Sequence, residues 1–124
     1  MNRCFMIIGA VAGAVAVGLG AFGTHGLKDQ ISVEMLHVYQ TGVEYLIIHA
    51  VVLLVTGWIG GGLPQRMIRA SGIAFIVGMV LFSGSLLMLA TTGLRALGAV
   101  APVGGAAFIT GWLLLAAALW RKAS

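Results

Sequence analysis

Four ionisable residues lie within or beside long apolar stretches of the sequence and could do chemistry there: His25, Glu44, His49 and Arg95. Charged groups are costly to bury in apolar surroundings unless they are paired or used. Two interpretations of this polar cluster stay open. It is a site for a substrate or a proton, or it is an internal clasp that holds helix ends together.

The clasp interpretation predicts an ion pair between Arg95 and Glu44, which are expected at similar depth. The alternative for Arg95 is that it reaches the lipid headgroups alone. Glu44 and His49 do not form a dyad on a regular helix, because five residues at about 100° each turn their side chains about 140° apart. We expect His49 to bond a neighbouring helix instead, with Ser83 and Ser85 as candidate partners.

Other kinds of chemistry find no support in the sequence. His25, His37 and His49 are isolated, without the Cys and His spacing that zinc sites use. The nucleophile motif G-x-S-x-G, the zinc motif H-E-x-x-H and the phosphate-binding P-loop are all missing. The sequence therefore predicts no metal, no cofactor and no catalytic residue, and a protein that is not an enzyme.

The composition indicates whether the chain lies in water or in a membrane. Only 8% of the 124 residues are charged and 60% are hydrophobic, with 19 glycines and 2 prolines, whereas a soluble domain carries roughly 25% charged residues. The net charge of +4 is spread over single or paired basic residues, which form no patch for nucleic acid. One cysteine, Cys4, excludes a disulfide scaffold. The chain is predicted to lie in a membrane, with the lipid bilayer as its first partner.

The charged residues divide the sequence into four charge-free runs of 24, 21, 25 and 25 residues, at 4–27, 45–65, 70–94 and 96–120. About 20 residues of helix cross the hydrocarbon core, and backbone that faces lipid must be helical to satisfy its hydrogen bonds. We therefore predict an all-α, four-helix transmembrane bundle. It forms one domain, 1–124, with spans near 4–24, 43–62, 70–93 and 97–120.

The first run could instead be a secretory signal peptide, since Arg3 precedes it. Its apolar stretch is longer than the roughly 7–15 residues of a signal core, which favours a span. Basic residues then set the orientation, because they are enriched in cytoplasmic flanks. Five basic residues flank the side that holds the two termini: Arg3, Arg66, Arg69, Arg121 and Lys122. Two flank the other side, Lys28 and Arg95. This difference predicts cytoplasmic termini.

A polar segment, 32–41, precedes the second span. On a helix that begins at Ser32, Met35 and Tyr39 share an apolar face and Glu34 lies on the polar one. Ser32 suits the N-cap. The segment either protrudes as a continuation of the second span or is bent at Gly42 to lie as an amphipathic helix in the interface.

Small residues predict close helix packing. Gly9, Gly13, Ala16 and Gly20 recur at helical spacing along the first span, where small side chains let helix backbones approach. Further packing glycines are expected in the third and fourth spans, at Gly84, Gly104 and Gly105. Pro102 with the glycine pair predicts a kink in the fourth helix.

Four blocks of the sequence are similar to a known family: GAFGTHGL (20–27), QTGVEYLIIHA (40–50), LFSGSLLMLA (81–90) and APVGGAAFITGW (101–112). They resemble the small membrane proteins grouped as domain of unknown function 423, of the YgdD and YwdK type, with distant relatives in transmembrane protein 256. The resemblance implies an integral, multi-pass protein of the inner (plasma) membrane. It implies no mechanism.

Two functional hypotheses follow from these features. The leading one is a non-enzymatic membrane protein that acts through helix packing with protein or lipid partners, as a homodimer or with another membrane protein. The alternative is a small dimeric transporter or proton-coupled carrier, which would use the polar cluster in the outer leaflet. The presence or absence of a cavity at Glu44 and His49 distinguishes the two.

Overall fold

The computed structural model describes residues 1–123. Their elements are long helices joined by short connections, and two of the long helices contain a π-helical turn. The elements are α1 (Arg3–Phe22), η1 (Gly23–Leu27), α2 (Val33–Ile59), α3 (Gln65–Gly78), η2 (Met79–Ser83), α4 (Gly84–Thr92), η3 (Arg95–Ala99) and α5 (Ala101–Ala123). No strand occurs in this part of the chain, as predicted.

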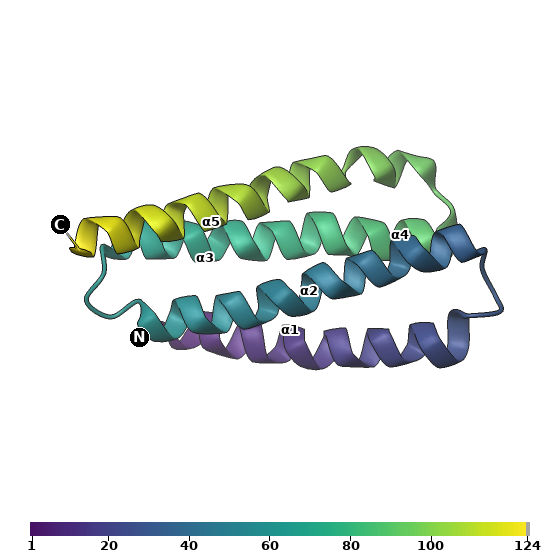
Figure 1. Ribbon diagram of the computed structural model, residues 1–124, viewed down its shortest axis with the longest axis horizontal. Coiled ribbons are helices and arrows are strands. Elements are labelled where there is room, and N and C mark those ends of the chain that lie inside the picture. The colour runs from purple at the N-terminus through teal and green to yellow at the C-terminus, as the bar shows by residue number, and fades with distance from the viewer. Residues whose placement is uncertain (124) are drawn as a thin grey trace.

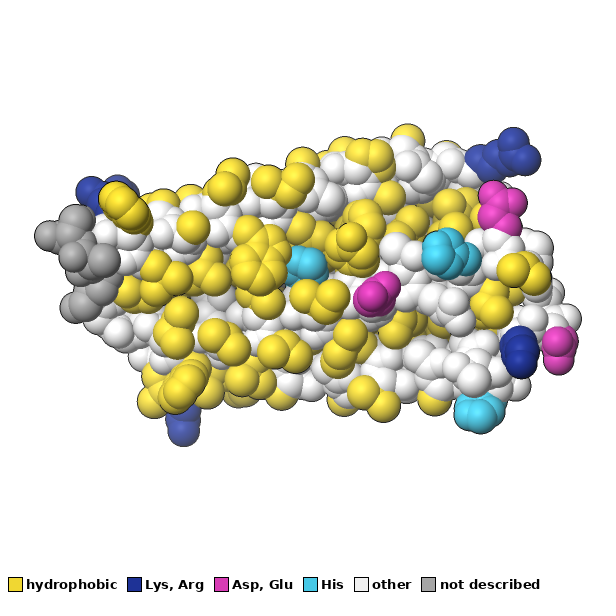
Figure 2. All heavy atoms as spheres, viewed as in Figure 1, with side chains coloured by type: hydrophobic (Ala, Val, Ile, Leu, Met, Phe, Trp, Pro, Cys, Tyr) yellow, Lys and Arg dark blue, Asp and Glu magenta, His cyan; other side chains and the backbone are white. Residues whose placement is uncertain are grey.

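Four continuous helical stretches are long and apolar enough to cross a membrane: Arg3–Leu27, Val33–Ile59, Gln65–Thr92 and Arg95–Arg121. Each keeps most of its apolar window outside the protein interior. Figure 2 shows hydrophobic side chains over the middle of one face, with Lys and Arg side chains toward the two ends. The predicted four-helix transmembrane fold is confirmed.

The polar segment before the second span is part of α2. Ser32 caps this helix, because its Oγ accepts a hydrogen bond from the backbone N–H of Met35 at 3.1 Å. The helix then runs without a break through Gly42, so the bent, interfacial alternative is wrong. Gly42 has a packing role instead: an added Cβ would meet Leu86 and Leu87 of α4 at 3.2 and 3.3 Å.

The helices are arranged as two hairpins side by side (Figure 1). α1 packs along α2, and α3 and η2 of the continuous α3–η2–α4 rod pack along α5. α2 joins the hairpins, because it also packs against α3, η2 and α4. The N-terminus and the last turns of α5 lie at the same end of the molecule (Figure 1), as an even number of spans requires. The side chain of Lys122, one of the basic residues predicted for this end, is outside the described part.

The fourth helix is not broken at its proline. Pro102 is the second residue of α5, in the first turn, where a helix needs no backbone N–H donor. The predicted kink is therefore absent. α4 ends at Thr92 and is capped by Gly93, whose φ of 75° is left-handed and suits glycine.

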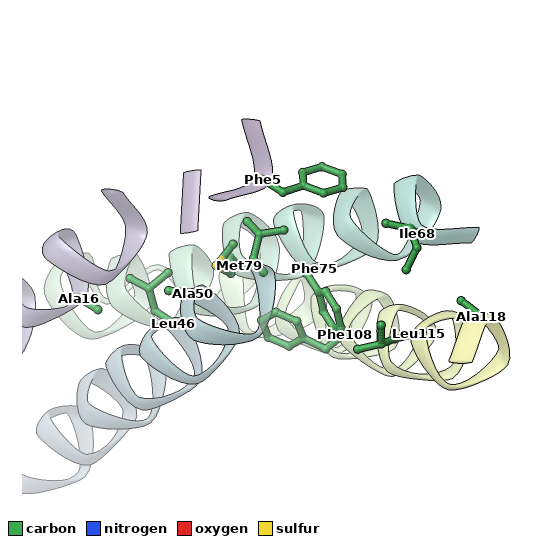
Figure 3. Close-up of a cluster of buried hydrophobic side chains, with 11 residues drawn as sticks. Phe5, Ala16, Leu46, Ala50, Ile68, Phe75, Met79, Phe108, Leu115 and Ala118 are labelled. Atoms are coloured by element: carbon green, nitrogen blue, oxygen red, sulfur yellow. The ribbon is translucent and has the colours of Figure 1, made fainter. Parts of the chain in front are cut away.

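The main core lies where all four long helices meet (Figure 3). Phe5 of α1 reaches α3, Leu46 and Ala50 come from α2, and Phe75 and Phe108 come from α3 and α5. A smaller cluster of Leu27, Tyr39 and Ala90 closes the other end. These two clusters hold α2 against α1 on one side and against the second hairpin on the other. They thereby position the side chains of α2 that form the site.

Candidate functional site

The four side chains of the predicted polar cluster do not form a clasp. Within residues 1–123, no hydrogen bond or ion pair joins any two of His25, Glu44, His49 and Arg95. His25, Glu44 and Arg95 are exposed, whereas His49 is buried. The predicted ion pair between Arg95 and Glu44 is not formed.

The reason is a difference in depth. Gly42 of α2 packs against Leu87 of α4, and the rod continues beyond this contact toward the loop. Arg95 follows Leu87 by eight residues, which places it by helical rise at about the level of the first turn of α2. Glu44 is eleven residues beyond Val33, the first residue of α2, which at 1.5 Å per residue is roughly 17 Å deeper.

His49 is held by two hydrogen bonds that the sequence did not predict. Its Nδ1 lies 2.8 Å from the carbonyl oxygen of Tyr45, and its Nε2 lies 3.1 Å from the indole nitrogen of Trp112. An indole N–H can only donate, so Nε2 accepts, and Nδ1 carries the proton and donates to the Tyr45 carbonyl. His49 is therefore a neutral imidazole with one defined tautomer. Ser83 and Ser85, its predicted partners, do not bond it.

Aromatic rings of α2, α3 and α5 surround this imidazole, and a ring of η2 packs against the outer ones. Phe108 of α5 stacks on His49, with ring centroids 3.6 Å apart and an angle of 12° between the planes. Phe75 of α3 packs edge-on against Trp112 at 5.6 Å. Tyr45 of α2 contacts Phe82 of η2 at 4.8 Å. These contacts fix the rings in place where α2 faces α5.

A pocket of about 320 Å³ lies beside this cluster, between α2 and α5. It is lined by Tyr45, His49, Phe82, Gly105, Phe108, Ile109 and Trp112. Tyr45 is 40%, Trp112 44% and Ile109 63% exposed, so the pocket opens on the side of the bundle. Small-molecule sites are typically apolar, aromatic and about 300–1,000 Å³ in volume, with a few placed polar groups. This pocket has those properties, and its mouth faces the hydrocarbon of the bilayer.

Glu44 precedes Tyr45, a wall of the pocket, on α2. Its side chain is exposed and has no hydrogen-bond or ion-pair partner in the described part of the chain. No three His, Cys, Asp or Glu side chains among residues 1–123 are grouped so that they could hold a metal ion. The site thus consists of an aromatic pocket and a neutral histidine in its wall, with one unpaired carboxylate outside the lining, on the residue before Tyr45.

Comparisons with known proteins agree with the fold. The family model described as "Protein of unknown function (DUF423)" matches residues 19–105. The chain belongs to the DUF423 family. It is 42% identical to the UPF0382 membrane protein YwdK of Bacillus subtilis, over 94% of this chain and 95% of that protein. It is 43% identical to a UPF0382 membrane protein of Staphylococcus epidermidis, over 98% of both chains. No solved structure matches the chain.

The predicted packing glycines of this DUF423 protein differ in how close their neighbours are. An added Cβ at Gly9 would lie 2.7 Å from the carbonyl oxygen of Ala50 on α2. At Gly13 and Gly20 the nearest atoms are side-chain carbons at 3.9 and 3.5 Å, which is ordinary contact. Gly84 departs from the prediction, because nothing lies within 4 Å of such a Cβ.

The two glycines of α5 have separate roles. Gly104 packs directly on the backbone of η2, where an added Cβ would come within 2.7 Å of Cα of Phe82. Gly105 lines the pocket, and its added Cβ would only reach the Phe82 ring at 3.8 Å. The close approach at Gly104 sets the distance between α5 and Phe82, and so the width of the pocket.

Sequence reasoning identified His49 and Gly105 but missed the rest of the pocket. Trp112, Phe108 and Phe82 look like ordinary lipid-facing or core residues, since aromatic residues in spans are common. A signal was present, because every residue that lines the pocket lies in the blocks 40–50, 81–90 or 101–112 that carry the family resemblance.

Proposed function

We propose that this protein is a non-enzymatic, multi-pass protein of the inner (plasma) membrane that binds an apolar or amphiphilic small molecule from the bilayer. The pocket between α2 and α5 is the binding site. The observation that carries this proposal is the pocket itself: it is aromatic, of ligand size, and open toward lipid.

The state of His49 supports a binding role over catalysis. A general base needs a free nitrogen within reach of the substrate. Both nitrogens of His49 are engaged, one by the Tyr45 carbonyl and one by Trp112. The imidazole therefore fixes the wall of the pocket.

The carrier alternative keeps one support, the pocket beside His49, and loses another, the predicted polar cluster. The cluster depended on the convergence of His25, Glu44, His49 and Arg95, and the depth difference separates Arg95 from Glu44. A protein partner, including a second copy of the chain, stays a prediction. In that case an apolar side chain of the partner would fill the pocket.

Fluorescence of Trp112 tests the proposal directly. The variant with Trp58→Phe and Trp120→Phe keeps Trp112 as its single tryptophan, since the chain has 3. In phosphatidylcholine nanodiscs, we expect ω-bromododecanol to quench this tryptophan with saturation at low mole fraction. Collisions in the bilayer alone would give quenching that rises without saturation.

A matched pair of glycine variants assigns the quenching to the pocket. Gly105→Leu places a side chain in the pocket, whereas Gly18→Leu adds the same side chain to α1 where nothing lies within 4 Å. We expect Gly105→Leu to remove the saturable component and Gly18→Leu to keep it. Saturation that survives in Gly105→Leu, or is absent from the parent protein, would overturn the proposal. A crosslinked dimer that Gly105→Leu abolishes would identify a second copy as the occupant.

A further inference from the structure

We propose that the pocket is selective for membrane-soluble organic cations, molecules that join an ammonium group to an apolar body, and that Glu44 provides this selectivity. The inference rests on the proposed function, because it names the class of ligand that the same pocket takes. Its first support is the position of Glu44, and its second is the chemistry of the pocket walls.

Glu44 is an exposed carboxylate within an apolar, membrane-spanning helix. It is eleven residues from the first residue of α2 and fifteen from the last, so it lies below the headgroups with hydrocarbon around it. Ionisable residues in this position are costly and usually face a partner or a ligand. Glu44 has neither a cation nor a hydrogen-bond donor as a partner within residues 1–123.

The lining of the pocket carries no positive charge. None of the seven lining residues is Lys or Arg, and His49 is neutral in the hydrogen-bonded arrangement described above. Arg95 lies roughly 17 Å nearer the outer end of the helix. With no basic residue in the lining and a carboxylate on the residue before Tyr45, the charges around the mouth favour a cation over fatty acids and phosphate headgroups.

The walls of the pocket suit an ammonium group as well. The rings of Tyr45 and Trp112 are 40% and 44% exposed at the mouth, so their surfaces are accessible. Aromatic faces attract ammonium ions, most strongly where water is excluded. Glu44 and Tyr45 are neighbours in α2 with side chains turned about 100° apart. Glu44 therefore lies outside the lining and acts through its charge on a cation held at the Tyr45 ring. The apolar body of the ligand then fills the space against Phe82 and Ile109.

A competition experiment separates this inference from the proposed function. In the single-tryptophan protein, dodecyltrimethylammonium and dodecanol compete with ω-bromododecanol and restore Trp112 fluorescence. The two competitors share a tail and differ in charge. We expect the ammonium compound to act at a mole fraction about tenfold lower, in line with a carboxylate and cation–π contact away from water.

Two variants test the role of Glu44. Glu44→Gln removes the charge beside the pocket, and Glu34→Gln removes one carboxylate from the exposed first turn of the same helix. We expect Glu44→Gln to abolish the preference for ammonium while dodecanol competes as before, and Glu34→Gln to keep the preference. If both competitors bind equally to the parent, or if Glu44→Gln keeps the preference, the cation inference fails and the pocket proposal stands. If neither competitor binds, both fail.

Discussion

The hydrogen bond between Trp112 and His49 joins two walls of the pocket. It is the one hydrogen bond that joins α2 to α5 among the residues described. Its acceptor belongs to a side chain that is only 4% exposed, so loss of the donor leaves a buried nitrogen unpaired. The sequence offered no route to this pair, because its members are 63 residues apart in the chain and tryptophan in a membrane helix usually indicates the interface.

Trp112→Phe should therefore destabilise the protein by about 1–2 kcal/mol, because it keeps an aromatic, though smaller, ring and removes the N–H donor. Thermal unfolding in detergent measures the effect. Trp58→Phe is the control, since Trp58 is 63% exposed and does not line the pocket. Equal shifts in unfolding temperature for both variants would show that the hydrogen bond contributes no net stability.

Arg95 and Glu44 should behave as independent residues. Side chains in contact show coupling of about 0.5–3 kcal/mol in double-mutant cycles, whereas distant ones add within about 0.5 kcal/mol. The difference in depth places this pair in the second group. We expect the losses in unfolding free energy caused by Arg95→Ala and by Glu44→Ala to sum to the loss in the double variant. A double variant that loses clearly less than the sum would restore the clasp interpretation.

The contact between α1 and α2 is closest at one glycine of the small-residue stripe. The sequence predicted the stripe but treated Gly9 and Gly13 alike, since helical spacing gives the face and not the distance to the neighbouring helix. In the structure, the backbone of α2 at Ala50 and Leu54 lies against Gly9. Gly13 meets only the end of the Ile47 side chain.

The two glycines should thus respond differently to alanine. Gly9→Ala forces the helix backbones apart, since its Cβ would lie 2.7 Å from a carbonyl oxygen, and overpacking of this kind costs about 1–3 kcal/mol. Gly13→Ala meets no such obstacle and gains up to about 1 kcal/mol of helix propensity. Unfolding by SDS titration measures the stability of both variants relative to the parent protein. Equal destabilisation would mean that α1 is displaced from the position described.

The start of α2 shows why charges give the number of spans but not the ends of helices. The charge-free run begins at residue 45, yet the helix begins at Val33 and carries Glu34 and Glu44. Lipid makes a charge costly in the hydrocarbon, as at Glu44, but does not prevent a helix from continuing into the headgroups, as at Glu34. The extra turns place Tyr39 against α1, where its hydroxyl donates to the Leu19 carbonyl at 2.6 Å. The polar segment is therefore used in packing.

At the scale of the whole molecule, the number, order and helical character of the spans could be predicted because the bilayer restricts them so strongly. The pocket could not be predicted, because it depends on how closely α5 approaches η2 at Gly104 and on which rings then meet. Such distances arise from the fit of several helices together, and no single segment of the sequence contains them.

The orientation of the bundle is the remaining global property that the sequence addresses. Arg3, Arg66, Arg69, Arg121 and Lys122 flank the end that holds both termini, and Lys28 and Arg95 flank the other end. Because basic flanks are retained in the cytoplasm, the connection that contains η3 should face the outside. Gly98 is exposed in η3, with nothing within 4 Å of an added Cβ, and Gly61 is exposed in the connection before α3.

A cysteine at each of these glycines reports the side of the membrane on which it lies. In a Cys4→Ser background, which removes the single native cysteine, a membrane-impermeant maleimide should label Gly98→Cys in intact cells. Gly61→Cys should react only after the cells are permeabilised. The reverse pattern would place both termini outside. The mouth of the pocket lies in the same half of the bundle as η3, so a ligand would then enter it from the cytoplasmic leaflet. The labelling therefore decides from which leaflet an organic cation would reach Glu44.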